Sequence, residues 1–379
     1  MNPWLWVATI AFGTLFWTWF LFPALTCLLA RLLPARPEVT LSEFPHVSAI
    51  LASRDDVESI AARVEDFFTA DYPQDRLQVV VGVDGASPDK LAAIRAACVR
   101  YNVIVIAADE EGGKCAGLNA AVRQASGEVL VFSDVQQRFA PDAIRLLVAR
   151  LASDDRIGAV GGALQLPGDR PDAGGRSPVE WYWFLERQLR AAEARLHSSV
   201  GLSGSIYAMW RRDWHPMPKY LILDDVWLPM RLVLDGRRVH YDLSAKAWDA
   251  RSTSAAQEKV RKVRTLTGNF QLLALLPTVL VPLRNPVWLQ LISHKVLRLL
   301  TPWLAFLLAV SLAVLTVQLV PAVMLPALLS GVALAALIVL VLPRTRYIAV
   351  RAATWFWTLQ AAVMEATMNG LRGRWNVWR

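Results

Sequence analysis

Two long stretches of this sequence lack charged residues altogether. Residues 1–30 contain no Asp, Glu, Lys, Arg or His, and residues 299–342 contain none either. A helix that crosses a bilayer needs about 20 apolar residues, so each stretch is long enough to span one. The first stretch also lacks the basic start and the small-residue cleavage site of a secretory signal. We therefore expect an integral membrane protein whose first helix is a permanent anchor.

Cysteine is scarce. Cys27, Cys98 and Cys115 are odd in number, one lies in an expected span, and no two have the spacing of metal ligands. This pattern argues against a disulfide framework and is typical of a reducing compartment. The sequence also contains no evident Ser/His/Asp relay and no His/Cys metal cluster.

Acidic residues are nearly absent from the last third of the chain. The net charge is +8, but residues 251–379 hold 14 Lys and Arg against Glu258 and Glu365, a balance of +12 that leaves −4 for the residues before them. Basic membrane flanks indicate cytoplasmic positions, and they also suit phosphates or anionic headgroups. Because no basic stripe with interleaved aromatics lies outside these flanks, we do not expect nucleic acid as a partner.

The flanking charges predict a topology. Basic residues close to the apolar stretches can all lie in the cytoplasm, namely Arg31, Arg36, Lys295, Arg298, Arg344 and Arg346. The second stretch is long enough for a helical hairpin that turns near Gln318 and Pro321. The tail is expected to form an interfacial helix, with a third crossing left open. The prediction is a multi-pass protein of the inner (plasma) membrane with a cytoplasmic domain.

Strand and helix patterns alternate between the two apolar stretches. The first half predicts strands at 46–52, 78–83, 103–107 and 128–133 and helices at 57–68, 90–100 and 116–125. The second half predicts strands at 159–165 and 238–241, a loop entering a strand at 201–210, and helices at 179–197, 224–234 and 257–276. Such alternation indicates the α/β class, with a mostly parallel sheet flanked by helices.

Carboxylates follow several of these apolar runs. Asp84 and Asp134 come directly after predicted strands, and Asp224 and Asp225 follow a third short apolar run. Open α/β sheets bind ligands at the carboxyl ends of their strands. Together with the basic string at 261–264, this favours a polyanionic ligand handled at a membrane surface.

Seven short motifs occur in order between residue 46 and the second apolar stretch. They are Ala-Ser-Arg-Asp-Asp at 52–56, Val-Asp-Gly-Ala-Ser-Pro-Asp at 83–89, Gly-Gly-Lys-Cys-Ala-Gly-Leu-Asn at 112–119, Asp-Val-Gln at 134–136, Gly-Leu-Ser-Gly-Ser-Ile-Tyr-Ala at 201–208, Leu-Asp-Asp-Val-Trp-Leu at 223–228 and Arg-Lys-Val-Arg-Thr at 261–265. Their order resembles the membrane-bound family 2 glycosyltransferases, which include cellulose, hyaluronan and poly-N-acetylglucosamine synthases and ceramide glucosyltransferase. The resemblance implies a GT-A fold and transfer from a nucleotide-sugar.

For the donor, the resemblance implies that Ser53, Asp56 and Asp84 lie at the nucleotide, with Asp84 on the uracil. The first motif usually reads Pro-Ala-Tyr/Arg-Asn-Glu. Lys114 would contact ribose or phosphate. The motif at 134–136 usually reads Asp-x-Asp and holds Mg²⁺ or Mn²⁺ across the two phosphates. Asp134 is therefore the candidate metal ligand, although Gln136 replaces the second carboxylate.

For the acceptor, the resemblance implies that Asp225 deprotonates a hydroxyl, a step that typically contributes about 10²- to 10⁴-fold. Gly204, Ser205 and Asp224 would shape the sugar and acceptor pocket.

Two late cations, Lys262 and Arg264, would pair with the departing diphosphate. Thr265 replaces a Trp of the polymerising members, which weighs against processive synthesis.

Several of these motifs also have a plainer interpretation. Asp84 could belong to an ordinary turn, Lys114 to a solvated loop, Asp134 to a helix cap and Asp224 to a helix start. The basic string could lie on lipid, and this role is compatible with phosphate binding.

The sequence thus predicts five segments: an anchor at 1–33, a cytoplasmic GT-A domain at 46–255, amphipathic interface helices with a phosphate-binding motif at 256–295, a transmembrane hairpin at 296–342 and a membrane-associated helix at 343–379. The expected activity is inverting transfer from a nucleotide-sugar, UDP by resemblance, to a membrane lipid or glycan. A processive polysaccharide synthase and a non-catalytic nucleotide-sugar-binding subunit remain as alternatives. The sugar, the linkage and the oligomeric state are left open.

Overall fold

The fold is described from a computed structural model. It covers residues 2–34, 37, 39–169, 176–249, 255–321, 324, 330–331, 333–334, 337, 339 and 341–375. The chain divides into two compact units. We name Ala24–Ser252 with Gln271–Leu291 the sheet unit, and Met1–Pro23 with Thr253–Phe270 and Ile292–Arg379 the helical unit.

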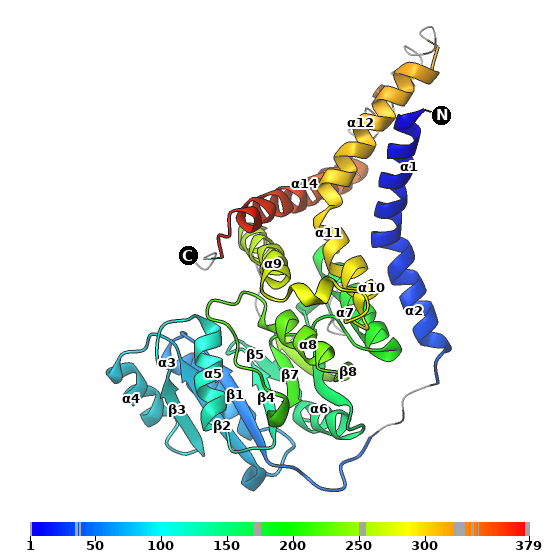
Figure 1. Ribbon diagram of the computed structural model, residues 1–379. Helices are drawn as coiled ribbons and strands as arrows, with labels where there is room; N and C mark the ends of the chain where they lie inside the picture. The colour runs from blue at the N-terminus through cyan, green and yellow to red at the C-terminus, as the bar shows by residue number, and fades with distance from the viewer. Residues whose placement is uncertain are drawn as a thin grey trace. The chain divides into compact units, whose positions relative to one another are not determined.

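The sheet unit is built on an eight-stranded sheet with the strand order β3-β2-β1-β4-β7-β6-β8-β5. Figure 1 labels most of these strands. The strands are β1 (Val47–Ala52), β2 (Leu77–Val83), β3 (Val103–Ala107), β4 (Val129–Ser133), β5 (Gln137–Phe139), β6 (Ile157–Gln165), β7 (Ile206–Trp210) and β8 (Arg238–Asp249). Neighbours among β1 to β4 pair in parallel, and so do β6 and β8. β7 runs antiparallel to β4 and β6, and β5 runs antiparallel to β8. The predicted α/β class with a mostly parallel sheet is confirmed.

The helices follow the strands in the predicted alternation. They are α1 (Pro3–Phe16), α2 (Phe22–Leu32), α3 (Val57–Phe68), α4 (Pro88–Ala97), α5 (Lys114–Gln124), α6 (Ala143–Ala152), α7 (Pro178–Leu196), α8 (Asp224–Leu234), α9 (Ala255–Leu275), α10 (Trp288–Leu291), α11 (Leu297–Leu299), α12 (Thr301–Leu319) and α14 (Pro343–Leu371). A π-helical turn, Trp17–Leu21, joins α1 to α2. The strand at β5 and the helix α6 are absent from the sequence prediction, and β8 is longer than predicted.

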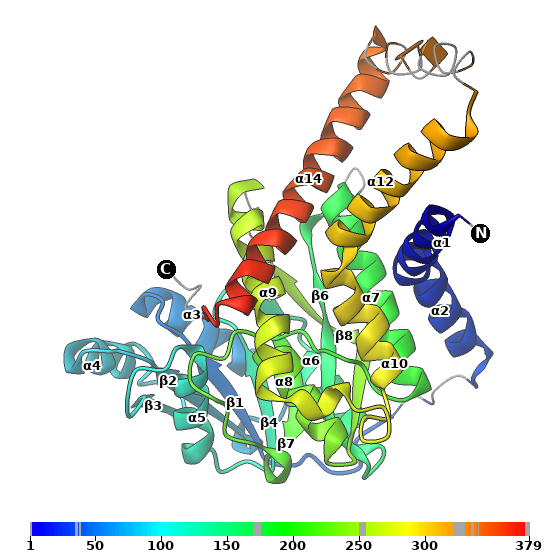
Figure 2. The same cartoon turned by 45° about the horizontal axis from the view of Figure 1, so that its top comes forward.

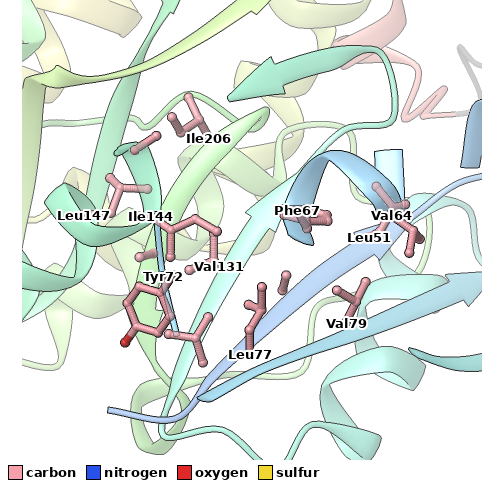
Figure 3. Packing of buried hydrophobic residues seen from close by; sticks show 14 of the residues in the cluster. Leu51, Val64, Phe67, Tyr72, Leu77, Val79, Val131, Ile144, Leu147 and Ile206 are labelled. Carbon is pink, nitrogen blue, oxygen red and sulfur yellow. The ribbon is translucent and has the colours of Figure 1, made fainter. Parts of the chain in front are cut away.

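Side chains alternate along each strand, so every strand points residues to both faces of the sheet. Helices cover both faces at the parallel strands and bury these residues. Leu51, Val79 and Val131 face a core that α3, α4 and α6 cover (Figure 3). On the other face α5 packs on β1, β2 and β3. Gly82 permits this close packing, since a Cβ atom there would overlap the backbone of Gly117. The first residue of α5, Lys114, is thereby brought to the carboxyl ends of the parallel strands.

In the helical unit, α1 lies beside α12 (Figures 1 and 2). Asn2 Nδ2 donates to Gln318 Oε1 at 2.7 Å near one end of the pair, and Trp17 Nε1 donates to Ser293 Oγ at 2.9 Å near the other. The two helices are therefore antiparallel. Paired polar groups of this kind suit a lipid environment, where unsatisfied hydrogen-bonding groups are costly.

Two helices, Pro3–Leu32 and Thr301–Leu319, are long and apolar enough to cross a membrane by length and composition. The second of them ends next to the predicted turn at Gln318 and Pro321. The second helix of the predicted hairpin falls mostly outside the described residues. The tail forms the 29-residue helix α14, and its interfacial placement stays a prediction.

Candidate active site

Asp84 lies directly after β2 and is almost fully enclosed. Its carboxylate accepts the backbone N–H groups of Gly112 at 3.2 Å and Gly113 at 3.0 Å. Arg54 Nε donates to it at 3.0 Å, and the second guanidinium nitrogen of Arg54 pairs with it as well. The Asp84 side chain is only 3% exposed, whereas that of Arg54 is 60% exposed. Asp84 therefore anchors the loop before α5 and pairs with the exposed side chain of Arg54.

The anchored loop sets the position of Lys114. Gly113 caps α5 with a φ of 74°, a left-handed conformation that glycine adopts without strain. Because Asp84 holds the N–H groups of residues 112 and 113, it fixes where α5 begins. The Gly-Gly-Lys motif thus forms the start of α5, and Asp84 binds this start to the end of β2.

Lys114 joins two of the predicted carboxylates. Its Nζ lies 2.9 Å from Asp134 Oδ1, after β4, and 3.1 Å from Asp224 Oδ2, at the start of α8. Burial disfavours the charged lysine, but the two carboxylates outweigh burial and raise the pKa of Lys114 above its ordinary value. Residues from the third, fourth and sixth sequence motifs therefore meet around one ammonium group.

Asp225 lies beside the small-residue loop that precedes β7. The loop and α8 are tied together by Leu202 N–H, which donates to the backbone oxygen of Asp225 at 2.8 Å. A Cβ atom on Gly204 would lie 3.4 Å from Asp225 Cβ and 3.7 Å from Asp225 Oδ2. Ser205 is buried, and its Oγ is 3.3 Å from Ser203 Oγ. The predicted pocket residues Gly204 and Ser205 thus lie on the loop that borders the predicted base.

Arg190 is a buried residue of this region that motif reading does not identify. It extends from α7 and donates from Nη1 to the backbone oxygen of Leu202 at 2.7 Å. Burial works against its charge, but Glu186 and other nearby groups, among them Asp225, raise the pKa of Arg190. Arg190 therefore holds the loop and places a permanent positive charge near Asp225.

A second buried arginine, Arg63 of α3, supports the loop that carries Asp134. Both Nε and Nη2 of Arg63 donate to Ser133 Oγ, at 3.0 and 2.9 Å, and this hydroxyl donates to the backbone oxygen of Asp134 at 2.8 Å. The guanidinium also pairs with Asp66 and lies over the rings of Phe67 and Phe139. Burial lowers the pKa of Arg63 to about 9. The sequence does offer a hint that Arg63 is buried, because Arg63 lies on the apolar stripe of α3, three residues after Ile60.

The first motif forms the loop between β1 and α3. Ser53 Oγ accepts the backbone N–H of Asp55 at 2.9 Å, and the side-chain amide of Gln136 donates to Asp55 Oδ2 at 3.4 Å. Asp56 caps α3 by accepting from Ser59 N–H at 2.7 Å, and hydrogen bonds from Ser59 lower the pKa of Asp56. Asp55, rather than Asp56, is therefore the acidic residue of this motif that contacts the 134–136 loop.

Lys262 and Arg264 lie on α9 as predicted, within the part of that helix that belongs to the helical unit. Their contact with a diphosphate stays a prediction.

The donor set at the end of β4 suits a shared metal site. In the parts of the chain that the structure describes, no group of three or more His, Cys, Asp or Glu is arranged to hold a metal alone. Mg²⁺ usually binds through one or two carboxylates together with substrate phosphates, and Mn²⁺ prefers the same oxygen ligands. Asp134 already holds a cation, the ammonium of Lys114. These residues fit a divalent ion whose remaining ligands come from a substrate.

Comparison with known proteins gives a family match and distant relatives. Residues 48–215 match the family model described as Glycosyl transferase family 2. Poly-beta-1,6-N-acetyl-D-glucosamine synthase of Staphylococcus aureus (strain COL) is 20% identical over 217 residues, which are 56% of this chain and 52% of that protein. Beta-monoglucosyldiacylglycerol synthase of Synechocystis sp. is 27% identical over 166 residues, 40% of this chain and 33% of that protein. The chain thus spans about half the length, or less, of these curated relatives.

One solved structure resembles nearly the whole chain. The mannosyltransferase PcManGT from Pyrobaculum calidifontis, solved in complex with GDP-Man and Mn²⁺, matches with a TM-score of 0.69 at 21% identity and covers 97% of both chains. The sheet, the flanking helices and this likeness define a GT-A fold. Residues 48–215, a little less than half of the chain, match the family 2 glycosyltransferases, and this match supports glycosyl transfer as the activity of that domain.

Proposed function

We propose that this protein transfers a sugar from UDP to a hydroxyl of a membrane lipid or glycan at the cytoplasmic face of the inner membrane, with inversion at the anomeric carbon. The observation that carries the proposal is the bridge of Lys114 to Asp134 and Asp224. It joins the residues assigned to the donor phosphates with the acidic pair assigned to the acceptor. The proposal therefore places both substrates beside this bridge.

The transfer needs a base and a stabilised leaving group. We assign the base to Asp225, which would take the proton of the acceptor hydroxyl as the oxygen attacks the anomeric carbon. The bond from that carbon to the phosphate oxygen breaks, and its electron pair leaves with the diphosphate. A single displacement of this kind inverts the configuration.

Charge on the leaving diphosphate would be balanced by fixed cations. Lys114 can exchange a carboxylate partner for a phosphate oxygen, and Lys262 and Arg264 are assigned to the same anion. A divalent ion held by Asp134 would add Lewis-acid stabilisation of the departing charge. The Mn²⁺ in the Pyrobaculum mannosyltransferase structure supports this assignment, without deciding between Mg²⁺ and Mn²⁺.

The assignment of UDP rests on the family resemblance at Asp84, and GDP-Man in the Pyrobaculum structure makes GDP the nucleotide to test beside it. A membrane location is supported by the two apolar helices and the basic flanks. The names of the relatives, a polysaccharide synthase and a glycolipid synthase, support a glycan or lipid acceptor.

Processive synthesis is the second candidate, because one relative is a polysaccharide synthase. Thr265 weighs against it, since the polymerising members carry Trp at this place in the motif.

The test uses the full-length protein in detergent or nanodiscs with lipid extract. UDP-sugars and GDP-mannose are supplied with Mn²⁺ or Mg²⁺, and release of the nucleoside diphosphate is measured. We expect EDTA-sensitive release of UDP that falls by about 10²- to 10⁴-fold in Asp225→Asn. The exposed Asp75→Asn serves as the matched control. Nucleotide binding without release, unchanged by Asp225→Asn, would instead identify a non-catalytic subunit, and product length separates single transfer from polymerisation.

A further inference from the structure

Asp55 and Gln136 meet at the end of β4, beside the candidate metal ligand Asp134. We infer that Asp55 supplies the second carboxylate of the metal and diphosphate site, in place of the one that residue 136 does not provide. This inference rests on the proposed function. It adds a residue to that site which none of the motif assignments includes.

Asp55 and Gln136 are in long hydrogen-bond contact, and the loop that carries Asp55 is held in place. Gln136 Nε2 lies 3.4 Å from Asp55 Oδ2. Asp55 is fixed by its own backbone N–H, which donates to Ser53 Oγ at 2.9 Å, and Ser53 N–H donates to Gly82 O at 3.2 Å. The β1–α3 loop therefore presents Asp55 toward the 134–136 loop from the neighbouring strand.

The loop of residues 134–136 is equally well fixed. Arg63 holds Ser133, and Ser133 holds the backbone oxygen of Asp134. Arg138 Nη1 donates to the backbone oxygen of Val135 at 2.8 Å. Two half-buried carboxylates, Asp55 and Asp134, thus flank Gln136 on rigid supports. Preset ligands of this kind bind a cation without first paying to order a loop.

The sequence motifs give an independent reason for the assignment. Aligned with the pattern Pro-Ala-Tyr/Arg-Asn-Glu, Asp55 stands where that pattern has Asn, and Gln136 stands where Asp-x-Asp has its second Asp. By this resemblance, the chain has a carboxylate where the first pattern has an amide, and an amide where the second pattern has a carboxylate. The pair keeps a single negative charge, and both side chains keep oxygen atoms of the type that Mg²⁺ and Mn²⁺ bind.

The test measures Mn²⁺ binding directly, by titration calorimetry or by the paramagnetic resonance signal of free Mn²⁺, with the full-length protein saturated with UDP. Asp55→Asn removes the charge but keeps an oxygen that can accept from Gln136. We expect it to weaken Mn²⁺ binding by at least about tenfold, the lower end of what loss of a supporting metal-site partner costs. The exposed Asp75→Asn should bind Mn²⁺ as the unmodified protein does.

The decisive variant restores the usual arrangement. Asp55→Asn combined with Gln136→Asp puts the carboxylate back on the 134–136 loop, and we expect Mn²⁺ affinity to return to within about threefold of the unmodified protein, since the charge of the pair is again the same. Thermal unfolding midpoints, recorded without Mn²⁺, should agree among all variants. Asn at residue 55 can still form the hydrogen bond with residue 136, so loss of that bond would not explain a change in Mn²⁺ affinity.

Unchanged Mn²⁺ affinity in Asp55→Asn, or a double variant that binds no better than Asp55→Asn, would overturn the inference. Either result would leave the proposed function standing, provided that the unmodified protein still releases UDP with Mn²⁺. Absence of UDP release from the unmodified protein would overturn the proposed function, while the Mn²⁺ titrations would still decide the role of Asp55.

Discussion

Asp84 and Asp134 carry the same sequence signature and have different surroundings. Each follows a buried parallel strand, and β2 and β4 are the two neighbours of β1. The Asp84 side chain is 3% exposed and accepts from two backbone N–H groups and Arg54. The Asp134 side chain is 40% exposed and holds the ammonium of Lys114. A carboxylate saturated by several donors serves mainly to hold a loop, whereas a partly exposed carboxylate with one ammonium partner is suited to exchange that partner for a ligand.

Within this comparison of Asp84 and Asp134, the largest effect on activity should come from Asp134→Asn. We expect the rate of UDP release to fall by about 100-fold or more, the scale of electrostatic stabilisation in active sites. The unfolding midpoint should change little, because the side chain is partly exposed and its partner Lys114 keeps Asp224. Parallel assays of UDP release and thermal unfolding in detergent would check this. If Asp134→Asn were destabilised but still active, Asp134 would serve, like Asp84, mainly to hold a loop.

Arg63→Met tests the support behind Asp134. Breaking a buried ion pair by removing one partner leaves a charge without its counterion and costs about 3–5 kcal/mol. Here Asp66 would lose its partner and Ser133 two donors, so we expect a clear drop in the free energy of unfolding. Arg145→Met is the control, since its guanidinium pairs with Asp71 at the surface and exposed pairs contribute about 0–1 kcal/mol. Equal losses in the two variants would contradict the buried role of Arg63.

Asp84→Asn should mainly lower the free energy of unfolding, by less than Arg63→Met does. An amide in place of the carboxylate keeps one acceptor but turns N–H groups toward the donors of Gly112, Gly113 or Arg54. A buried donor left unsatisfied costs about 1–3 kcal/mol. The measurement is the unfolding midpoint, and Arg54→Met in the same background should add little further loss. If Asp84→Asn abolished UDP release at full stability, the carboxylate would be a ligand contact first.

The last prediction concerns the chemical reactivity of Cys115, the residue after Lys114, and its expected effect is the smallest. Burial is the main cause that raises the pKa of this thiol, and the charge of Asp224 adds to it. The reactive form of a thiol is the thiolate. We therefore expect alkylation at pH 8 to spare Cys115 in the folded protein and to reach it after unfolding, as mass spectrometry of peptides would show. Rapid labelling of the native protein would indicate that the α5 start opens readily.

Local patterns predicted most of the elements. Helices α3 and α8 and strand β3 have the predicted bounds, because Val57, Ile60, Val64 and Phe67 recur at helical spacing and β3 is a short apolar run. The three-residue strand β5 has too little pattern to detect. Helix α6 carries a helical signal, with Ile144, Leu147, Val148 and Leu151 all buried on one stripe. Its omission from the prediction is a missed pattern.

The sequence proposes residues for the candidate site, but it does not predict the contacts among them. Motifs identify Lys114, Asp134, Asp224 and Asp225, yet they say nothing of which carboxylates the lysine holds. Asp56 was predicted beside the donor, and the structure shows it as the cap of α3. The sequence did not identify Arg63 and Arg190, because a lone arginine in a helix is ordinarily solvated. Their burial depends on partners from other elements, the ring of Phe139 for Arg63 and the backbone oxygen of Leu202 for Arg190.

By itself, the sequence determined the charge-free helices, the alternation of strands and helices, and the kinds of chemistry available at the strand ends. These follow from composition and from periodicity along one segment. The tertiary structure alone decided that Arg54 covers Asp84, that Lys114 bridges Asp134 to Asp224, and that Asp55 meets Gln136. Such partners are separated along the chain, and they are selected by the order of the strands and the path of the loops, which no local pattern specifies.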